Sequence, residues 1–168
     1  MKCELLGLDD ILHPRSIAVI GASDNPLSRG YRFLEGLLDF GFGGKLYPIN
    51  PRHDEILGLK IYPTIAAVPE TVDYVISCVP ARDTVRLMPD CAAKKVKAVH
   101  VYSAGFSETR ETLGIELERE LVQAARQAGV RLIGPNCLGL HHPRLGVTFV
   151  SRAGFSRESG QAFGLFAL

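Results

Sequence analysis

The chain has 168 residues, of which 46% are hydrophobic and 22% charged, a composition typical of one folded domain with a substantial core. Lys and Arg together number 19 and Asp and Glu 18, so the formal net charge is only +1. This balance argues against nucleic-acid binding, because proteins that bind nucleic acid usually carry a strong basic excess. No apolar run approaches the ~20 residues that span a bilayer, and residues 1–10 lack the pattern of a signal peptide. We therefore expect a cytoplasmic protein that does not enter a membrane.

In the first third of the chain, two short apolar segments flank a helical pattern. Ser16–Ile20 (S-I-A-V-I) is rich in β-branched and apolar residues, as a parallel strand buried on both faces should be. Apolar residues then recur at helical spacing over 29–40, which predicts a helix. Residues 45–49 form the second predicted strand, and Asn50-Pro51-Arg52 follows it directly.

The same alternation continues through the rest of the chain. A predicted helix over 82–95 contains Pro89, which removes a backbone donor and should kink the helix or divide it in two. A longer helix is predicted over 111–128, with an apolar stripe on one side. The remaining predicted strands are 73–79, 97–102 and 130–133.

This order predicts an α/β fold, a Rossmann-like doubly wound parallel sheet of five or more strands. We assign residues 1–150 to this domain and 151–168 to a C-terminal tail, a candidate remnant of a following domain. The apolar end, 163–168, is expected to be a remnant strand that is either disordered or used in association.

The four cysteines have neither C-x-x-C spacing nor any other pattern of metal ligands. In a cytosolic protein they should be reduced, so we expect no structural disulfide and no metal site. They are Cys3, Cys78, Cys91 and Cys137.

Ligands of open parallel sheets bind at the carboxyl ends of the strands, and here these ends are followed by turns rich in small residues. The first turn begins at Gly21 and leads into the predicted helix. Exposed amides and the helix dipole at that point favour a phosphate, and Ser23, Ser28 and Arg29 add hydroxyls and a positive charge. An ordinary tight connection between strand and helix would have the same spacing.

The first turn lacks the G-x-G-x-x-G fingerprint of dinucleotide-binding domains, since Gly21 is followed by Ala22 and Ser23. NAD-binding domains also place an acidic residue after the second strand, where this chain has Asn50-Pro51-Arg52. A cation there suits a ligand with a further phosphate near its ribose, a description that fits both NADP and coenzyme A (CoA). A solvated surface arginine is the alternative explanation of Arg52.

Five ordered segments of the chain carry a more specific signal. They are S-I-A-V-I-G-A-S, G-K-L-Y-P-I-N-P, D-E-I-L-G-L-K-I-Y-P-T-I, S-A-G-F-S-E and G-P-N-C-L-G. Together they resemble the N-terminal CoA-binding domain of the nucleoside-diphosphate-forming acyl-CoA synthetases, over about residues 8–143. The α subunits of succinyl-CoA synthetase are more distant relatives.

This resemblance implies CoA as the cofactor and assigns a part of it to each turn. The phosphate-side loop comprises Gly21, Ala22, Ser23, Pro26, Ser28, Arg29 and Gly30. The turn near the ribose phosphate and adenine is Asn50, Pro51 and Arg52, and the segment lining the nucleotide is Cys78, Val79 and Pro80. Ser103, Ala104 and Gly105 match the turn along the pantetheine arm, and Asn136 and Cys137 the turn at the thiol end.

Two further features suggest chemistry that we do not assign. Cys137 suggests a nucleophile or a disulfide partner for CoA, but nothing in the sequence establishes the cation or helix N-terminus that would activate it, and a small buried cysteine is the favoured explanation. His141 and His142 are adjacent and would point in different directions, which is poor geometry for one metal ion. They stand where the family usually has I-N, and we expect an ordinary loop or surface role.

The family continues into a second α/β domain that carries a phosphohistidine, and then into a nucleotide-binding grasp domain. Neither is expected in these 168 residues, so this chain alone should form no acyl-CoA, and we assign it no catalytic residue. The predicted function is binding of CoA or acyl-CoA, either as a stand-alone module or as the N-terminal part of a synthetase with its other domains or subunits. The alternatives are an NAD(P)-binding oxidoreductase domain and a regulatory domain that has lost its ligand. The sequence does not determine the oligomeric state, and a homo-oligomer is one candidate assembly.

Overall fold

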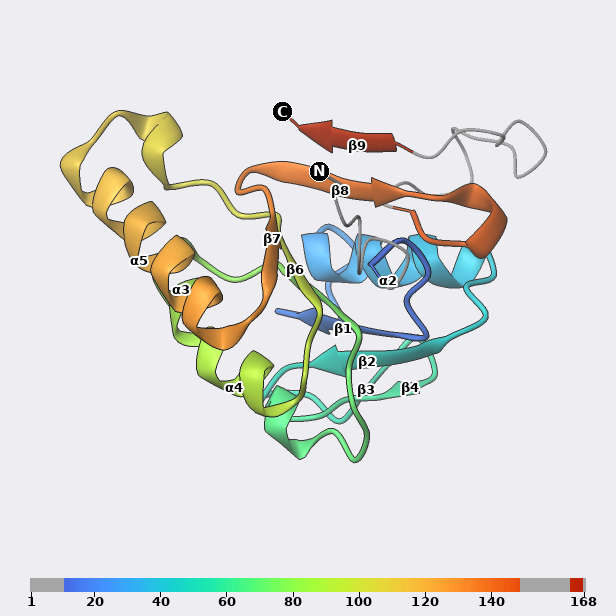
Figure 1. Cartoon of the computed structure of the whole chain (residues 1–168). Coiled ribbons are helices and arrows are strands. Elements are labelled where there is room, and N and C mark those ends of the chain that lie inside the picture. The colour runs from blue at the N-terminus through green and yellow to red at the C-terminus, as the bar shows by residue number, and fades with distance from the viewer. Residues whose placement is uncertain (1–10, 149–163, 168) are drawn as a thin grey trace, which may run out of the picture.

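Five parallel strands form the central sheet of the computed structural model, which describes residues 11–148 and the backbone of 164–167 (Figure 1). Their order in the sheet is β2-β1-β5-β6-β7. They are β1 (Ser16–Ile20), β2 (Lys45–Ile49), β5 (Tyr74–Ser77), β6 (Ala98–Val101) and β7 (Arg131–Ile133). The predicted Rossmann-like fold is confirmed, with the last three strands shorter at their ends than predicted.

Both faces of this sheet are covered. Helices α3 (Ala81–Arg86), α4 (Met88–Ala93) and α5 (Thr112–Ala128) lie on one face, and α2 (Arg29–Asp39) lies on the other together with β8 (Cys137–His141) (Figure 1). Every residue of β1 is buried, because alternate side chains enter the two cores. This explains why the strand reads as an apolar run without alternation.

The helix expected around Pro89 is divided in two, as predicted. Helix α3 ends before Leu87, and α4 starts at Met88 with Pro89 in its first turn. A first-turn amide has no partner within the helix, so proline costs least there. The division lets the two short helices follow the sheet together with η1 (Ile65–Ala67), which contacts α4.

Several short elements complete the described part of the chain. A two-stranded hairpin joins β3 (Glu55–Ile56) to β4 (Leu59–Lys60). Helical turns η2 (Ser107–Thr109) and η3 (Pro143–Leu145) lie in loops. None of these elements belongs to the predicted set.

A second unpredicted feature is the antiparallel pair of β8 with β9 (Gly164–Ala167). The register joins Leu140 to Leu165 and His141 to Gly164. Part of the expected remnant strand is therefore a strand within this chain, associated with β8. Residues 1–10, 149–163 and 168 lie outside the described residues, and with them Cys3 and most of the predicted tail. The division into 1–150 and 151–168 stays a prediction.

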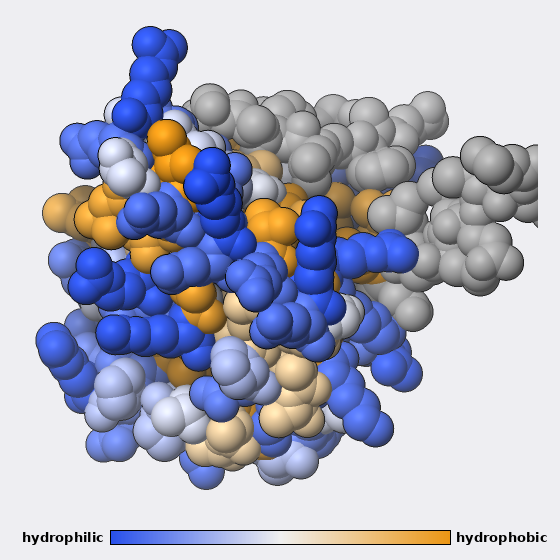
Figure 2. Space-filling view, turned by 60° about the vertical axis from the view of Figure 1, so that its left-hand side comes forward, coloured by the Kyte–Doolittle hydropathy of each residue, from blue (hydrophilic) through white to orange (hydrophobic). Residues whose placement is uncertain are grey.

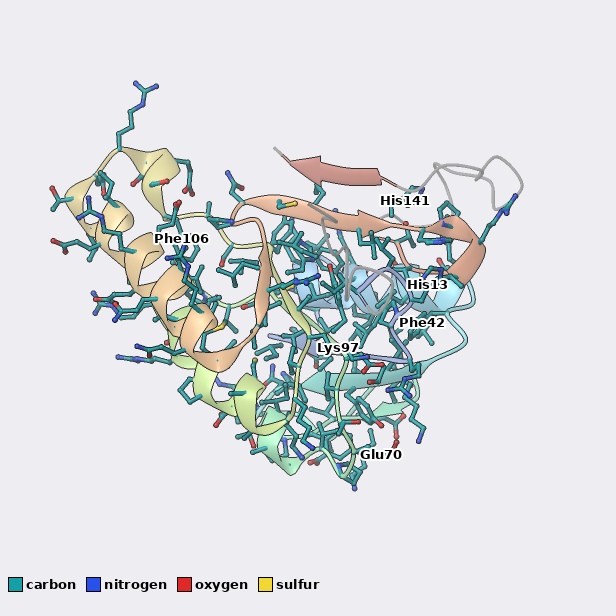
Figure 3. All side chains as sticks on the ribbon, viewed as in Figure 1. His13, Phe42, Glu70, Lys97, Phe106 and His141 are labelled. Carbon is teal, nitrogen blue, oxygen red and sulfur yellow. The ribbon has the colours of Figure 1, made fainter. Side chains whose placement is uncertain are left out.

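At the amino ends of the strands, a buried carboxylate ties three elements together. Asp73 is 4% exposed and accepts hydrogen bonds from the backbone amide of Arg15 at 3.0 Å and from its Nε at 3.2 Å. Lys97 Nζ lies 3.2 Å from the other carboxylate oxygen. Burial by itself would raise the pKa of Asp73, but the hydrogen bonds from Arg15 and Lys97 outweigh it and hold the pKa below its ordinary value. Figure 3 labels Lys97, which directly precedes β6, and Phe106, in the loop that follows the carboxyl end of β6.

We expect Asp73→Asn to lower the free energy of unfolding by about 2 kcal/mol at pH 7, since it removes charge-assisted hydrogen bonds. A carboxylate with a depressed folded-state pKa adds stability that is complete above its unfolded pKa and is lost as the pH falls through the folded value. The difference between parent and variant should therefore shrink toward zero below about pH 4. Urea unfolding from pH 7 to pH 3 measures it. The exposed Asp39→Asn control should change stability by less than about 0.5 kcal/mol, and a pH-independent Asp73 difference would contradict the assignment.

Candidate ligand-binding edge of the sheet

The five predicted turns lie at one edge of the molecule. Each directly follows a strand of the parallel sheet, so all five are at its carboxyl ends; we call this the carboxyl edge. The strand order reverses between β1 and β5, since the chain runs outward from β1 to β2 and then returns to β5. Ligands of such sheets bind at this kind of switch point.

At the switch point, the turn after β1 lies directly against the end of β5. Gly21 has φ +87°, and a Cβ built on it would lie 3.2 Å from the carbonyl atoms of Cys78. Its amide donates to Ile49 O at 3.1 Å, which ties the same turn to β2. Only glycine combines this backbone conformation with so close an approach.

The first turn of α2 packs onto this loop through Gly30. A Cβ built on Gly30 would lie 2.3 Å from the carbonyl oxygen of Gly21 and 2.9 Å from Cα of Ala22. The absence of a side chain therefore brings the N-terminus of α2 next to the Gly21 turn. That end of the helix carries no acidic residue in its first turn and offers a positive dipole to an anion.

The loop between β1 and α2 is held by its own polar groups. Ser28 caps α2, with Oγ accepting from the amide of Tyr31 at 3.2 Å. Asn25 bridges the loop. Its backbone amide donates to Ser23 Oγ at 3.2 Å, and its side-chain Oδ1 accepts from the backbone amide of Leu27 at 2.9 Å. Pro26 and Leu27 are exposed between them. The hydroxyls of Ser23 and Ser28 thus lie on an ordered loop and retain their hydrogens as donors.

Arg29 extends from this loop toward the end of β6. The residue is exposed, and its guanidinium carbon lies 5.5 Å from the ring centroid of Tyr102. Tyr102 in turn packs edge-on against Phe33 of α2, with centroids 5.5 Å apart. Tyr102 is absent from the predicted set, because the sequence places it inside the predicted strand 97–102, whereas β6 ends at Val101.

The turn after β2 is bound to the first loop through Asn50. Its Nδ2 donates to the carbonyl of Ala22, and its Oδ1 accepts from the amide of Arg52 at 2.9 Å. His53 Nε2 lies 3.8 Å from a carboxylate oxygen of Asp24, a second link that the sequence did not indicate. Pro51 and Arg52 are exposed beside this junction, so the arginine adjoins the phosphate-side loop without an ion pair of its own among the described side chains.

The turn after β5 carries a neutral thiol. Burial raises the pKa of Cys78 to about 12, although the positive charge of Arg29 acts in the opposite direction. Such a thiol stays protonated at neutral pH and does not act as a nucleophile. Thr84 Oγ1 holds the turn by donating toward the carbonyls of Val79 and Pro80, at 3.3 Å each.

The turns after β6 and β7 are joined to each other. Gly105 has φ +103°, and its amide and that of Phe106 donate to the carboxylate of Glu108. The carbonyl oxygen of Ser103 accepts a hydrogen bond from the backbone amide of Asn136 at 3.2 Å, and the next residue, Ala104, is exposed. Asn136 itself lies at φ +48°, in the left-handed region.

The cysteine of the last turn points inward. Cys137 is 1% exposed, and its Sγ accepts the amide of Gly139 at 3.3 Å. The interpretation as a small buried cysteine is the one that this burial favours, so a ligand at this turn would meet backbone and Asn136 rather than the thiol.

The expected loop or surface role of the two adjacent histidines is wrong for His141, which is buried on β8, while His142 is half-buried after it. His141 is 8% exposed, with Nδ1 2.9 Å from Thr148 Oγ1, and His142 packs edge-on against His13 at 5.4 Å between centroids. Figure 3 shows His141 and His13 on the side of the molecule that carries β8. Burial lowers the pKa of His141 and of His142. Among the described residues, no three His, Cys, Asp or Glu side chains gather as a metal site would require.

The side of the molecule that carries α3 and α5 is largely hydrophilic, with small separate apolar patches (Figure 2). An open groove of about 600 Å³ runs along α5, and its lining includes Ile115, Arg119 and Val122 but none of the predicted residues. Within residues 11–148 and 164–167, no helix is long and apolar enough to cross a membrane.

A doubly wound sheet with glycine turns meeting a helix N-terminus at its switch point defines the class of nucleotide-binding α/β domains. Within that class the chain can be assigned to one family, because residues 15–143 match the family described as CoA binding domain. The chain belongs to this family, of the type found in ADP-forming acyl-CoA synthetases, and the resemblance drawn from the sequence is confirmed.

Three similar proteins illustrate the relationship. The α subunit of ADP-forming acetate–CoA ligase II of Pyrococcus furiosus is 42% identical over 148 residues, which are 87% of this chain and 32% of that protein. ADP-forming acetate–CoA ligase II of Archaeoglobus fulgidus is 43% identical over 79% of this chain and 20% of its own length. The structure of Ca. Korarchaeum cryptofilum acetyl-coenzyme A synthetase 1 with phosphate and ADP superposes with a TM-score of 0.79 at 42% identity, over 84% of this chain and 30% of that one.

This chain thus spans a third or less of the synthetases that it matches. A conserved hypothetical protein of Pyrococcus furiosus is different in length. At 31% identity and a TM-score of 0.55, the match covers 70% of this chain and 90% of that protein. A similar fold therefore occurs both within long synthetases and in a chain somewhat shorter than this one.

Proposed function

We propose that this chain binds CoA or acyl-CoA along the carboxyl edge, as a stand-alone module or as the N-terminal part of a nucleoside-diphosphate-forming acyl-CoA synthetase. The observation that carries the proposal is the contact of Gly30 with the Gly21 turn at the switch point between β1 and β5. This contact brings backbone amides and a helix dipole to one place, which suits a phosphate group.

The order of the turns supports the proposed orientation of CoA. Along the edge, in the order β2-β1-β5-β6-β7, the turns begin at Asn50, Gly21, Cys78, Tyr102 and Gly134. The parts of CoA assigned to them, from the ribose phosphate through the nucleotide phosphates and the pantetheine arm to the thiol, follow nearly the same order. Five strands at about 4.8 Å spacing extend over about 19 Å, a span that suits a long cofactor lying across the edge.

Each part of the site has a separate task in this proposal. The loop with Ser23, Ser28 and Arg29 binds the pyrophosphate, and Arg52 binds the phosphate near the ribose. The turns after β6 and β7 hold the pantetheine arm so that the thiol remains available to an acyl donor. Phosphoryl transfer then belongs to other domains or subunits in the cytoplasm, and this chain supplies the bound thiol.

Calorimetric titration of the full chain with CoA, acetyl-CoA, NAD, NADP and ATP tests the proposal. We expect CoA or acetyl-CoA to bind at least about tenfold more tightly than NAD, a difference of about 1.4 kcal/mol. Binding of NADP or NAD without CoA would support the oxidoreductase alternative instead. A folded sample that binds none of the five ligands would support the alternative of a domain that has lost its ligand.

A further inference from the structure

A buried histidine on β6 contacts the strand that leads away from the proposed thiol-end turn. His100 is 1% exposed, and its Nε2 lies 2.6 Å from the carbonyl oxygen of Cys137 on β8. Its ring packs edge-on against Phe33 of α2, with centroids 5.5 Å apart. A Cβ built on Gly139 would lie 2.5 Å from the ring, so the glycine permits β8 to cross at this distance.

The acceptor at Nε2 determines the protonation state of the imidazole. A carbonyl oxygen only accepts, so Nε2 carries the hydrogen. Burial lowers the pKa of His100 to about 4, although the hydrogen bond to Cys137 acts in the opposite direction. The ring is therefore neutral at neutral pH and holds its hydrogen on Nε2.

This hydrogen bond completes a clamp around Asn136. On one side, the amide of Asn136 donates to Ser103 O at 3.2 Å, which fixes the turn to the loop after β6. On the other side, His100 holds the carbonyl of the next residue, Cys137. Asn136 has φ +48°, in the left-handed region that asparagine adopts more readily than most residues other than glycine. The two bonds hold this turn from both sides.

We propose that His100 is a positioning residue for the thiol half of the ligand site: its Nε2–H fixes the Asn136 turn, and it touches no ligand itself. The inference rests on the proposed CoA function. It predicts an effect mainly on one half of the cofactor, because the hydrogen bond of His100 goes to the residue after Asn136, whereas the nucleotide half is assigned to the turns after β1, β2 and β5.

The test compares CoA with its nucleotide half, adenosine 3′,5′-bisphosphate, by calorimetry. For His100→Leu, we expect the Kd of CoA to rise about tenfold, as the loss of one well-placed hydrogen bond would give. The Kd of the bisphosphate should stay within about twofold. His100→Gln can donate through its amide from a similar position and should recover most of the CoA affinity.

The matched control is Val99→Ala. Val99 is the neighbouring residue on β6, is fully buried, and points into the opposite core. It should destabilise the fold without changing the ratio of the two affinities. Equal weakening of both ligands by His100→Leu, or no change in either, would overturn the proposal. If the parent binds CoA and only the His100 result fails, the proposed function stands and the inference does not.

A measurement on the parent protein covers the case in which His100→Leu does not fold. Two-bond ¹H–¹⁵N NMR correlations of the labelled chain should show His100 as the neutral Nε2–H tautomer from pH 6 to 8. A ring protonated on Nδ1 alone would exclude the hydrogen bond to Cys137, and with it the clamp.

Discussion

Gly30→Ala is expected to abolish most CoA binding, with an affinity loss of about a hundredfold or more, equivalent to about 2.7 kcal/mol. The added Cβ would lie 2.3 Å from Gly21 O and 2.9 Å from Cα of Ala22, and both are backbone atoms that cannot rotate away. The helix N-terminus and the Gly21 turn must therefore separate, which disrupts the proposed phosphate site. Calorimetry with CoA measures the affinity.

The free energy of unfolding of Gly30→Ala provides a second test. Alanine in place of glycine normally stabilises a helix by about 0.5–1 kcal/mol, but overpacking should reverse the sign here. The matched control is Gly43→Ala, because a Cβ at Gly43 would meet no atom within 4 Å. We expect the control to bind CoA as the parent does. Parent-like affinity in Gly30→Ala would show that the close approach has no part in binding.

Arg29→Ala should weaken CoA binding about ten- to hundredfold, as the loss of a charge-assisted hydrogen bond worth ~1.5–3 kcal/mol would. The guanidinium extends from the N-terminus of α2 and packs over Tyr102, so it is held near the proposed phosphate site. Arg29→Lys keeps the charge but loses the planar contact with the ring, and should fall between parent and alanine variant. Titration at two salt concentrations measures both affinity and its salt dependence.

Arg32→Ala is the control for net charge. Arg32 is exposed on the same helix, less than one turn further along, and is not among the predicted ligand residues. Its removal should change the Kd of CoA by less than about twofold. If the two alanine variants weakened binding equally, the effect would come from the overall charge, and Arg29 would have no specific contact.

The central sheet could be predicted because its signals are local. Ser16–Ile20 reads as a strand buried on both faces from five consecutive residues, and Pro89 divides its helix for a reason that lies in its own ring. The ends of β1 and β2 could be located in the same way, by Gly21 and Asn50, whereas β5 and β6 end before the predicted residues. The ligand roles of those residues came from resemblance to a family, and they remain predictions.

The features that the sequence did not indicate depend on residues far apart in the chain. Strand β8 pairs with Gly164–Ala167, more than twenty residues later, and has no alternating pattern of its own. Asp73 is held by Arg15 and Lys97 from two other elements. Tyr102 was overlooked since its contact with Arg29 joins the end of a strand to the start of a distant helix.

By itself, the sequence determined the alternation of strands and helices, the family and the residue types available after each strand, because hydrophobic period and turn chemistry are encoded within a few consecutive residues. Only the tertiary structure decided which turns are neighbours, that Gly30 contacts Gly21, that Cys137 is buried, and that His100 donates to its carbonyl. These features depend on segments separated by up to 57 residues, as for Gly21 and Cys78, and they are set by how both cores pack around the sheet.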